Sequence, residues 1–209
     1  LVISPAKAGE GITFERTDIE PPVQIHAVVA NATDRARRTT ITNGEVTIDT
    51  IEHLMSALCG MGIDNAMIRL NGSEVPCGDG SAMLFVEPLL QAGTVEQDQP
   101  RRVFQIVEPI YIQDGDAMIS AFPSYQPGLH VVYDLDYGDA TSRIARQTQA
   151  WNSASGTYVK DVAPARTYSL EEEAQALQAQ GLCTHLTPTD MLVIGEAGPI
   201  DNSYRFDNE

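Results

Sequence analysis

The chain has 209 residues, a formal net charge of −16 at pH 7, 43% hydrophobic residues and 20% charged residues. This composition is typical of a folded globular protein, and the length suits one large domain or two small ones. The longest basic run is confined to residues 35–38. The charge therefore argues against nucleic acid as a partner and against adsorption to anionic lipid.

The cysteine content and the lack of long apolar runs indicate the cellular compartment of the protein. Three cysteines without a pairing pattern, Cys59, Cys77 and Cys183, suit a reducing compartment. No apolar run approaches the ~20 residues of a membrane span, and the first residues carry no cleavable signal pattern. We expect a cytoplasmic protein with no integral membrane segment.

Short β-type runs separated by proline, glycine and asparagine open the chain and predict strands. The expected strands cover residues 2–3, 13–14, 25–29, 39–42, 45–48 and 66–70. Asn43 and Gly44 form a hairpin turn signal between the fourth and fifth of these runs.

The most informative stretch is residues 50–65, TIEHLMSALCGMGIDN, which predicts a helix with a glycine stop at Gly60 and Gly62. Four apolar side chains recur on one face at helical spacing: Ile51, Leu54, Met55 and Leu58. Glu52 and His53 are adjacent in the first turn, where neighbouring side chains point about 100° apart. This arrangement suits a metal-ligating histidine beside a general base that activates metal-bound water.

An ordinary structural role for the same two residues stays open. The spacing of Asp49 and Glu52 fits a capping box, in which Glu52 only reaches back to a free backbone amide. A lone helical histidine such as His53 is more often a surface or core residue than a ligand. The pair alone does not decide between these interpretations.

The loop EVPCGDGSA, residues 74–82, is shaped by one proline and two glycines. Ser81 or Asp79 is expected to cap a helix over residues 82–92, which Pro88 should kink. A polar stretch, residues 94–100, is interpreted as a linker.

After the linker the β-type pattern returns. Strands are expected at residues 103–107, 110–112, 117–122, 129–135 and 191–194. Antiparallel strands followed by helices thus occur twice. We therefore expect an α+β protein of two domains with related shapes, residues 1–98 and residues 99–209.

Residues 164–181, PARTYSLEEEAQALQAQG, predict another helix, with a capping box from Ser169 to Glu172 and a stop at Gly181. Thr167 precedes this helix, where its hydroxyl or backbone amide could stabilise a developing oxyanion. Ordinary loop packing is the alternative for Thr167.

A zinc hydrolase needs about three protein ligands and one open position. The spacing of His130 and Asp134 resembles a ligand pair, but a strand is expected there, in which four residues span about 13 Å. One ion cannot bridge that length. His185 has no partner at useful spacing, so the residue pattern alone offers His53 as half of a site.

The stretch TIEHLMSALCGMGIDN followed by EVPCGDGSA resembles the UDP-3-O-acyl-N-acetylglucosamine deacetylase family, zinc enzymes of lipid A biosynthesis. Three further pieces occur in the family's order: SPAKAGEGITFERTD, ARTY with EEEAQALQAQGL, and TPTDMLVIGEAGPIDNSYRFDNE. The resemblance covers nearly the whole chain. It implies two β-α-α-β sandwich domains with the active site between them.

The resemblance also implies roles for individual residues. His53 would bind Zn²⁺, Glu52 would take a proton from the zinc-bound water, and Thr167 would stabilise the oxyanion as the N-acetyl group leaves as acetate. The implied substrate is UDP-linked acylated N-acetylglucosamine, with Tyr168 against the sugar. An inserted β-α-β unit at about residues 165–194 would form the acyl passage, lined by Leu170, Ala174, Leu177 and Cys183. For these four residues, packing in an ordinary core is the alternative.

Some family motifs do not occur in these 209 residues: the GLHTG turn of the first strand, the HKxxDxxGD helix and a later histidine. We therefore expect a fragment with an incomplete second domain. We expect it to be inactive alone, because one imidazole does not hold zinc at useful affinity. A fused dehydratase domain follows in some relatives and could follow here. The alternatives are a non-catalytic relative that binds a nucleotide sugar or a protein, and another metal hydrolase on a similar fold.

Overall fold

The computed structural model describes residues 1–138, 143–181, 186–207 and 209. Its strands are β1 (Val2–Pro5), β2 (Ile12–Arg16), β3 (Val23–His26), β4 (Ala32–Thr33), β5 (Thr40–Asn43), β6 (Val46–Ile48), β7 (Ala66–Leu70), β8 (Ile110–Asp114), β9 (Ala117–Ala121), β10 (His130–Leu135), β11 (Gln147–Asn152), β12 (Tyr168–Leu170), β13 (Leu192–Gly195) and β14 (Gly198–Pro199). Its helices are α1 (Glu52–Gly60), α2 (Met83–Ala92), α3 (Tyr158–Asp161) and α4 (Glu171–Ala179), with 3-10 turns η1 (Val29–Asn31) and η2 (Ser153–Ser155). This mixture of helices and strands confirms the α+β class.

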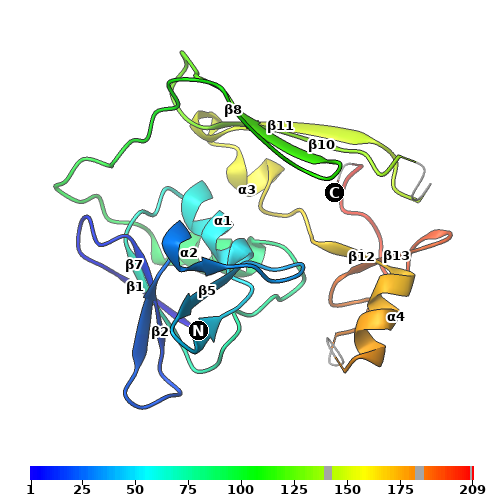
Figure 1. Ribbon diagram of the computed structural model, residues 1–209, viewed down its shortest axis with the longest axis horizontal. Coiled ribbons are helices and arrows are strands. Elements are labelled where there is room, and N and C mark those ends of the chain that lie inside the picture. Colours follow the sequence, from blue (N-terminus) through cyan, green and yellow to red (C-terminus); the bar gives the residue numbers. More distant parts are fainter. Residues whose placement is uncertain (139–142, 182–185, 208) are drawn as a thin grey trace.

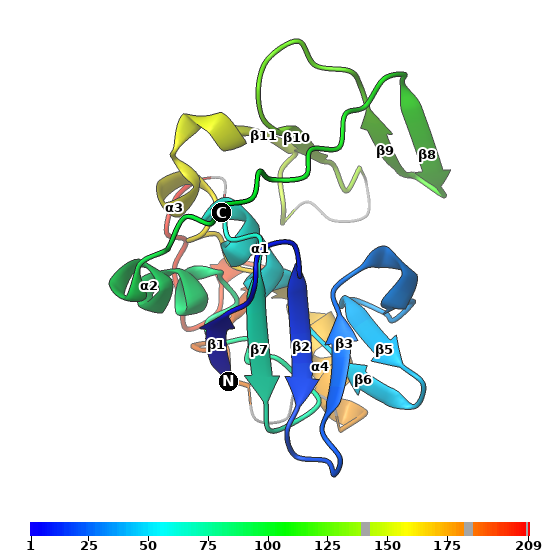
Figure 2. The same cartoon turned by 90° about the vertical axis from the view of Figure 1, so that its left-hand side faces the viewer.

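The N-terminal part is built on a four-stranded sheet in the order β1-β7-β2-β3 (Figure 2). Strand β7 runs parallel to β2, with Ile12 opposite Ala66, and antiparallel to β1. The connection between β2 and β7 contains β3, the small sheet β4-β5-β6 and α1. In this way, α1 is fixed at both ends by strands of the same core.

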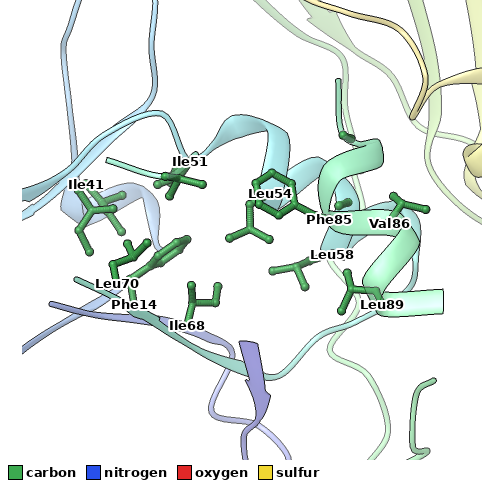
Figure 3. Packing of buried hydrophobic residues seen from close by; sticks show 14 of the residues in the cluster. Phe14, Ile41, Ile51, Leu54, Leu58, Ile68, Leu70, Phe85, Val86 and Leu89 are labelled. Carbon is green, nitrogen blue, oxygen red and sulfur yellow. The ribbon is translucent and has the colours of Figure 1, made fainter. Parts of the chain in front are cut away.

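Helices α1 and α2 contribute one face each to the main core. Figure 3 shows Phe14 and Ile68 of the sheet opposite Leu54 and Leu58 of α1, with Phe85 of α2 beside them. Burial of each such side chain contributes about 1.5–3 kcal/mol. Because the apolar stripe of α1 faces the sheet, the first turn of the helix is left at the edge of the core with its polar residues half-buried.

The second half contains less buried structure. Strands β8 and β9 form one hairpin, and β10 pairs antiparallel with β11. All five residues of β8 are exposed. Strand β12 pairs parallel with β13, α4 connects the two, and β13 continues antiparallel into β14. Figure 1 shows β12, β13 and α4 on the opposite side of the molecule from β1, β2 and β7.

One strand prediction is wrong, and another is wrong in extent. Residues 103–107 form no strand, and Val103 and Phe104 are more than four-fifths exposed. A β-type run becomes a strand only when another strand supplies hydrogen-bond partners, and none of the described strands pairs with this run. The strand expected over residues 25–29 ends at His26, where the chain turns into η1.

The helix boundaries also bring one correction. The capping box expected between Ser169 and Glu172 is wrong by one residue, because α4 begins at Glu171. The Glu173 carboxylate accepts a hydrogen bond of 3.1 Å from the backbone amide of Leu170. The predicted stop is confirmed, since Gly181 has a φ of +78°.

Candidate functional site

The first turn of α1 places Glu52 and His53 at the edge of the N-terminal core. The capping box between Asp49 and Glu52 is wrong. Asp49 instead accepts a hydrogen bond of 2.6 Å from the Thr40 hydroxyl, and Glu52 accepts one of 3.0 Å from the backbone amide of Thr39. The Glu52 carboxylate is thus oriented by the chain before β5, and its other oxygen is left for a further partner.

The His53 side chain is half-buried. Among the residues that the structure describes, none hydrogen-bonds to its imidazole, so both ring nitrogens can meet an added group. Within the same described ranges, no three His, Cys, Asp or Glu residues converge as a metal site would require. The described residues therefore do not fit a zinc ion by themselves, and His53 is a single ligand candidate.

The loop before α2 is organised by Asp79. Its carboxylate accepts hydrogen bonds from the backbone amide and the hydroxyl of Ser81, at 3.0 and 2.7 Å. The Ser81 hydroxyl oxygen in turn accepts one of 3.2 Å from the amide of Met83, the first residue of α2. The N-cap position of α2 is Ala82, one residue after the expected Ser81, although the Ser81 hydroxyl still accepts from the first helical amide. Gly78 and Gly80 have φ values of +58° and +80°, which only glycine adopts readily.

This loop is joined directly to the segment that carries Thr167. The amide of Thr167 donates a hydrogen bond of 2.7 Å to the carbonyl oxygen of Gly80, and the amide of Ala82 donates one of 3.0 Å to that of Ala163. The structure therefore brings together two of the sequence motifs that the resemblance singled out. The Thr167 residue itself is exposed, so its hydroxyl is accessible to a ligand.

A buried ion pair lies beside Thr167. The Arg166 guanidinium bonds to Glu209, Asn202 and the carbonyl oxygen of Ser203, and its side chain is 5% exposed against 0% for that of Glu209. Burial raises the pKa of Glu209, but hydrogen bonds from Arg166 and from the backbone of Arg205 outweigh it, so the pKa lies below its usual value. No sequence pattern indicated a role for Arg166, Arg205 or Glu209.

Arg205 links this ion pair to the loop before α2. Its guanidinium bonds to Asp79 and, at 2.9 Å, to the carbonyl oxygen of Pro164. Burial raises the pKa of Asp79, but its hydrogen bonds with Arg205 and Ser81 lower the pKa by more. In the sequence, the arginine next to Thr167 is the only hint of this linkage. It does not reveal which carboxylate the arginine meets.

A cleft of about 840 Å³ lies between α1, the β10-β11 ribbon and the segment around Tyr168. Its walls are mainly apolar and include Val131, Tyr133, Trp151, Tyr158 and Tyr168. Ser56 of α1 lies 2.8 Å from the Tyr158 hydroxyl, which fixes α3 against α1. The lining does not contain Glu52, His53 or Thr167, so the structure does not bring these three residues together in this cleft.

Among the substrate-binding predictions that fall on described residues, only Tyr168 lines the cleft. Its hydroxyl lies 2.6 Å from that of Tyr137, and burial, followed by this hydrogen bond, raises the pKa of Tyr168. Leu170 packs against the small core around Leu192 and Ile194. Ala174 and Leu177 are half-buried on α4, and Cys183 lies outside the described residues.

Comparison with known proteins identifies the family. The sequence model of LpxC, described as UDP-3-O-acyl N-acetylglycosamine deacetylase, matches residues 1–209. The chain belongs to this deacetylase family. It is 35% identical to the UDP-3-O-acyl-N-acetylglucosamine deacetylase of Pseudomonas entomophila (strain L48) over 96% of this chain and 66% of that protein. It is 34% identical to the same-named protein of Cellvibrio japonicus (strain Ueda107), over 100% of this chain and 69% of the relative.

The chain of this LpxC-family protein spans about two thirds of the length of the curated relatives that it matches. This coverage agrees with the expectation of a fragment. Among the helices of the described residues, none combines the length and the apolar character needed to cross a bilayer. The motifs that carried the resemblance, on α1, on the loop before α2 and before β12, lie in one family-matched region.

Proposed function

We propose that this chain carries part of the active site of an enzyme that removes the N-acetyl group of UDP-3-O-acyl-N-acetylglucosamine in lipid A biosynthesis. The observation that carries the proposal is the family match over residues 1–209. The curated relatives are named for that deacetylation. The products are the free amine and acetate.

The proposed chemistry assigns the base to Glu52. Water attacks the acetyl carbonyl carbon, Glu52 takes the proton of the water, and the same proton passes to the leaving nitrogen. A positioned general base contributes about 10²–10⁴-fold to the rate. The hydrogen bond from the amide of Thr39 supports this role, because it orients the carboxylate without protonating it.

Thr167 is proposed to stabilise the tetrahedral intermediate. Its hydroxyl would donate a hydrogen bond to the oxyanion, an interaction whose loss costs about 10²–10³-fold in kcat. The exposure of Thr167 and the anchoring of its backbone amide on Gly80 support this role. An anchored donor loses little entropy when the oxyanion develops.

Zinc remains part of the proposal for the full-length protein. His53 would be one ligand, and the other ligands would come from the third of the relatives' length that this chain does not span. The proton transfer is assigned to Glu52 and the contact with the oxyanion to Thr167. Because the described residues form no ligand set, we expect that residues 1–209 release no acetate on their own.

The remaining assignments complete the proposal. Tyr168 would pack against the sugar, and Leu170, Ala174, Leu177 and Cys183 would contact the acyl chain. The two-domain arrangement, with residues 1–98 and residues 99–209 on either side of the site, belongs to the same proposal. So do a cytoplasmic location and a dehydratase domain fused in the same chain.

The experiment compares full-length variants for acetate release from UDP-3-O-acyl-N-acetylglucosamine. Glu52→Gln is expected to lower kcat by about 10²–10⁴-fold, and His53→Ala to abolish stoichiometric zinc binding as well as turnover. Glu87→Gln, on the exposed side of α2, is the control and should match the wild type. Full turnover in both site variants would refute the assignment. Binding of the UDP-sugar without hydrolysis by the wild type would instead support a non-catalytic relative.

A further inference from the structure

We propose that Asp79, Arg205, Glu209 and Arg166 form a positioning network that holds Thr167 in place for the reaction. The inference rests on the proposed function, because it deepens the role assigned to Thr167. None of the four residues is proposed to touch the reacting atoms. They act through the backbone on both sides of Thr167.

The contacts of the network form an unbroken chain from one motif to the other. Asp79 bonds to the Arg205 guanidinium, and the backbone amide of Arg205 donates a hydrogen bond of 2.6 Å to Glu209. Glu209 then pairs with Arg166 through both carboxylate oxygens, one of them at 2.8 Å. Opposite charges alternate along the chain, so each charge is balanced by its neighbours.

The Arg166–Glu209 half of the network is buried, whereas the side chains of Arg205 and Asp79 are 36% and 38% exposed. The side chain of Glu209 is fully buried and that of Arg166 is 5% exposed, so water cannot replace a lost partner. Arg166 also donates to Asn202 at 3.0 Å and to the Ser203 carbonyl oxygen at 2.7 Å. A planar guanidinium with partners at all three nitrogens has one allowed orientation.

Thr167 is fixed by both ends of this chain. The residue before it, Arg166, is held by Glu209, and its own amide donates to the carbonyl oxygen of Gly80, the residue after Asp79. A shift at either end therefore moves the Thr167 hydroxyl. Displacement of a catalytic donor by about 1 Å can cost 10²-fold in rate.

The first test measures hydrogen exchange of the Thr167 amide by NMR in the full-length protein. Asp79→Asn and Glu209→Gln remove one charge each with little change in shape, and both are expected to accelerate this exchange at least tenfold. Asp64→Asn is the matched control, because it neutralises a similar exposed pair with Arg101, 2.9 Å away. Unchanged exchange of the Thr167 amide in the two network variants would overturn the proposal. If only one of the two variants folds, the result for that variant decides.

The second test separates positioning from general stability. Asp79→Asn is expected to lower kcat about tenfold with KM nearly unchanged, and to lower it less than twofold when Thr167→Ala is already present. An equal loss of kcat in both backgrounds would overturn the positioning role. If the wild type has no deacetylase activity, the proposed function fails, while the exchange measurement still decides whether the network anchors Thr167.

Discussion

The backbone amide of Thr167 lies 2.7 Å from the carbonyl oxygen of Gly80 and donates a hydrogen bond to it. This contact joins the loop before α2 to the segment before β12, although residues 81–166 separate the two in sequence. It also leaves little space at Gly80. A Cβ atom there would lie 3.0 Å from the Thr167 Cγ2 atom.

We predict that Gly80→Ala displaces Thr167 and destabilises the fold. Alanine at a φ of +80° costs about 1–2 kcal/mol, and the contact with Thr167 adds to this cost. Gly156→Ala is the control, because Gly156 is in the left-handed region with a φ of +70° but has open space around it. The difference between the two variants in unfolding free energy, measured with urea, isolates the contact between the added methyl group and Thr167. Equal losses of unfolding free energy would show that Thr167 adapts freely to the added methyl group.

A second prediction concerns Gly60, the last residue of α1. Helix propensity alone would favour Gly60→Ala by about 1 kcal/mol. The added Cβ atom, however, would overlap the ring of Tyr158, which is 4% exposed and held by Ser56. We therefore expect a net loss of about 1–3 kcal/mol in unfolding free energy. Gly72→Ala, where no atom lies within 4 Å, is the comparison. A stabilised Gly60→Ala variant would mean that α3 does not pack as described.

The pH dependence of stability should contain a contribution from Glu209. Its pKa in the folded state is lowered from the usual 4.5, so the folded state favours the charged form more than the unfolded state does. The stabilisation is therefore present above about pH 4.5 and is lost as the pH falls through the folded-state pKa.

The measurement is urea unfolding of the wild type and of Glu209→Gln between pH 3 and pH 7. The variant should be less stable at pH 7 and should lose less stability on acidification. Glu196→Gln removes a carboxylate that is 91% exposed and serves as the control. Parallel curves for the wild type and Glu209→Gln would contradict the prediction.

The exposed apolar side chains of the β8-β9 hairpin lead us to expect self-association of the 209-residue chain. Ile112 and Ile119 are opposite each other in the hairpin and are 60% and 67% exposed. Contiguous exposed apolar side chains on a two-stranded hairpin, whose described outer edges pair with no further strand, favour association. We expect Ile112→Lys to shift sedimentation velocity towards monomer and to change stability by less than about 0.5 kcal/mol. Gln113→Lys, on the alternate face of the same strand, should have less effect on sedimentation. A wild-type chain that is monomeric at all concentrations would refute this prediction.

The sequence by itself determined the elements whose signals are local. The apolar stripe of α1, the β-type run of β7, the turn at Asn43 and Gly44 and the stop at Gly181 all depend on residues a few positions apart. Periodicity and glycine conformations act over that distance, so these elements could be predicted without knowledge of any partner. The adjacency of Glu52 and His53 on one helical turn follows for the same reason.

Only the tertiary structure decided which polar groups meet. Residues 103–107 have the composition of a strand but find no partner among the described strands, whereas β11, without a strong signal, pairs with β10. Glu52 turns to Thr39 rather than to its own helix, and Arg166 meets Glu209 beside Thr167. Burial forces the charges of Arg166 and Glu209 to find partners, and for both contacts the nearest partner in space depends on how the whole chain packs.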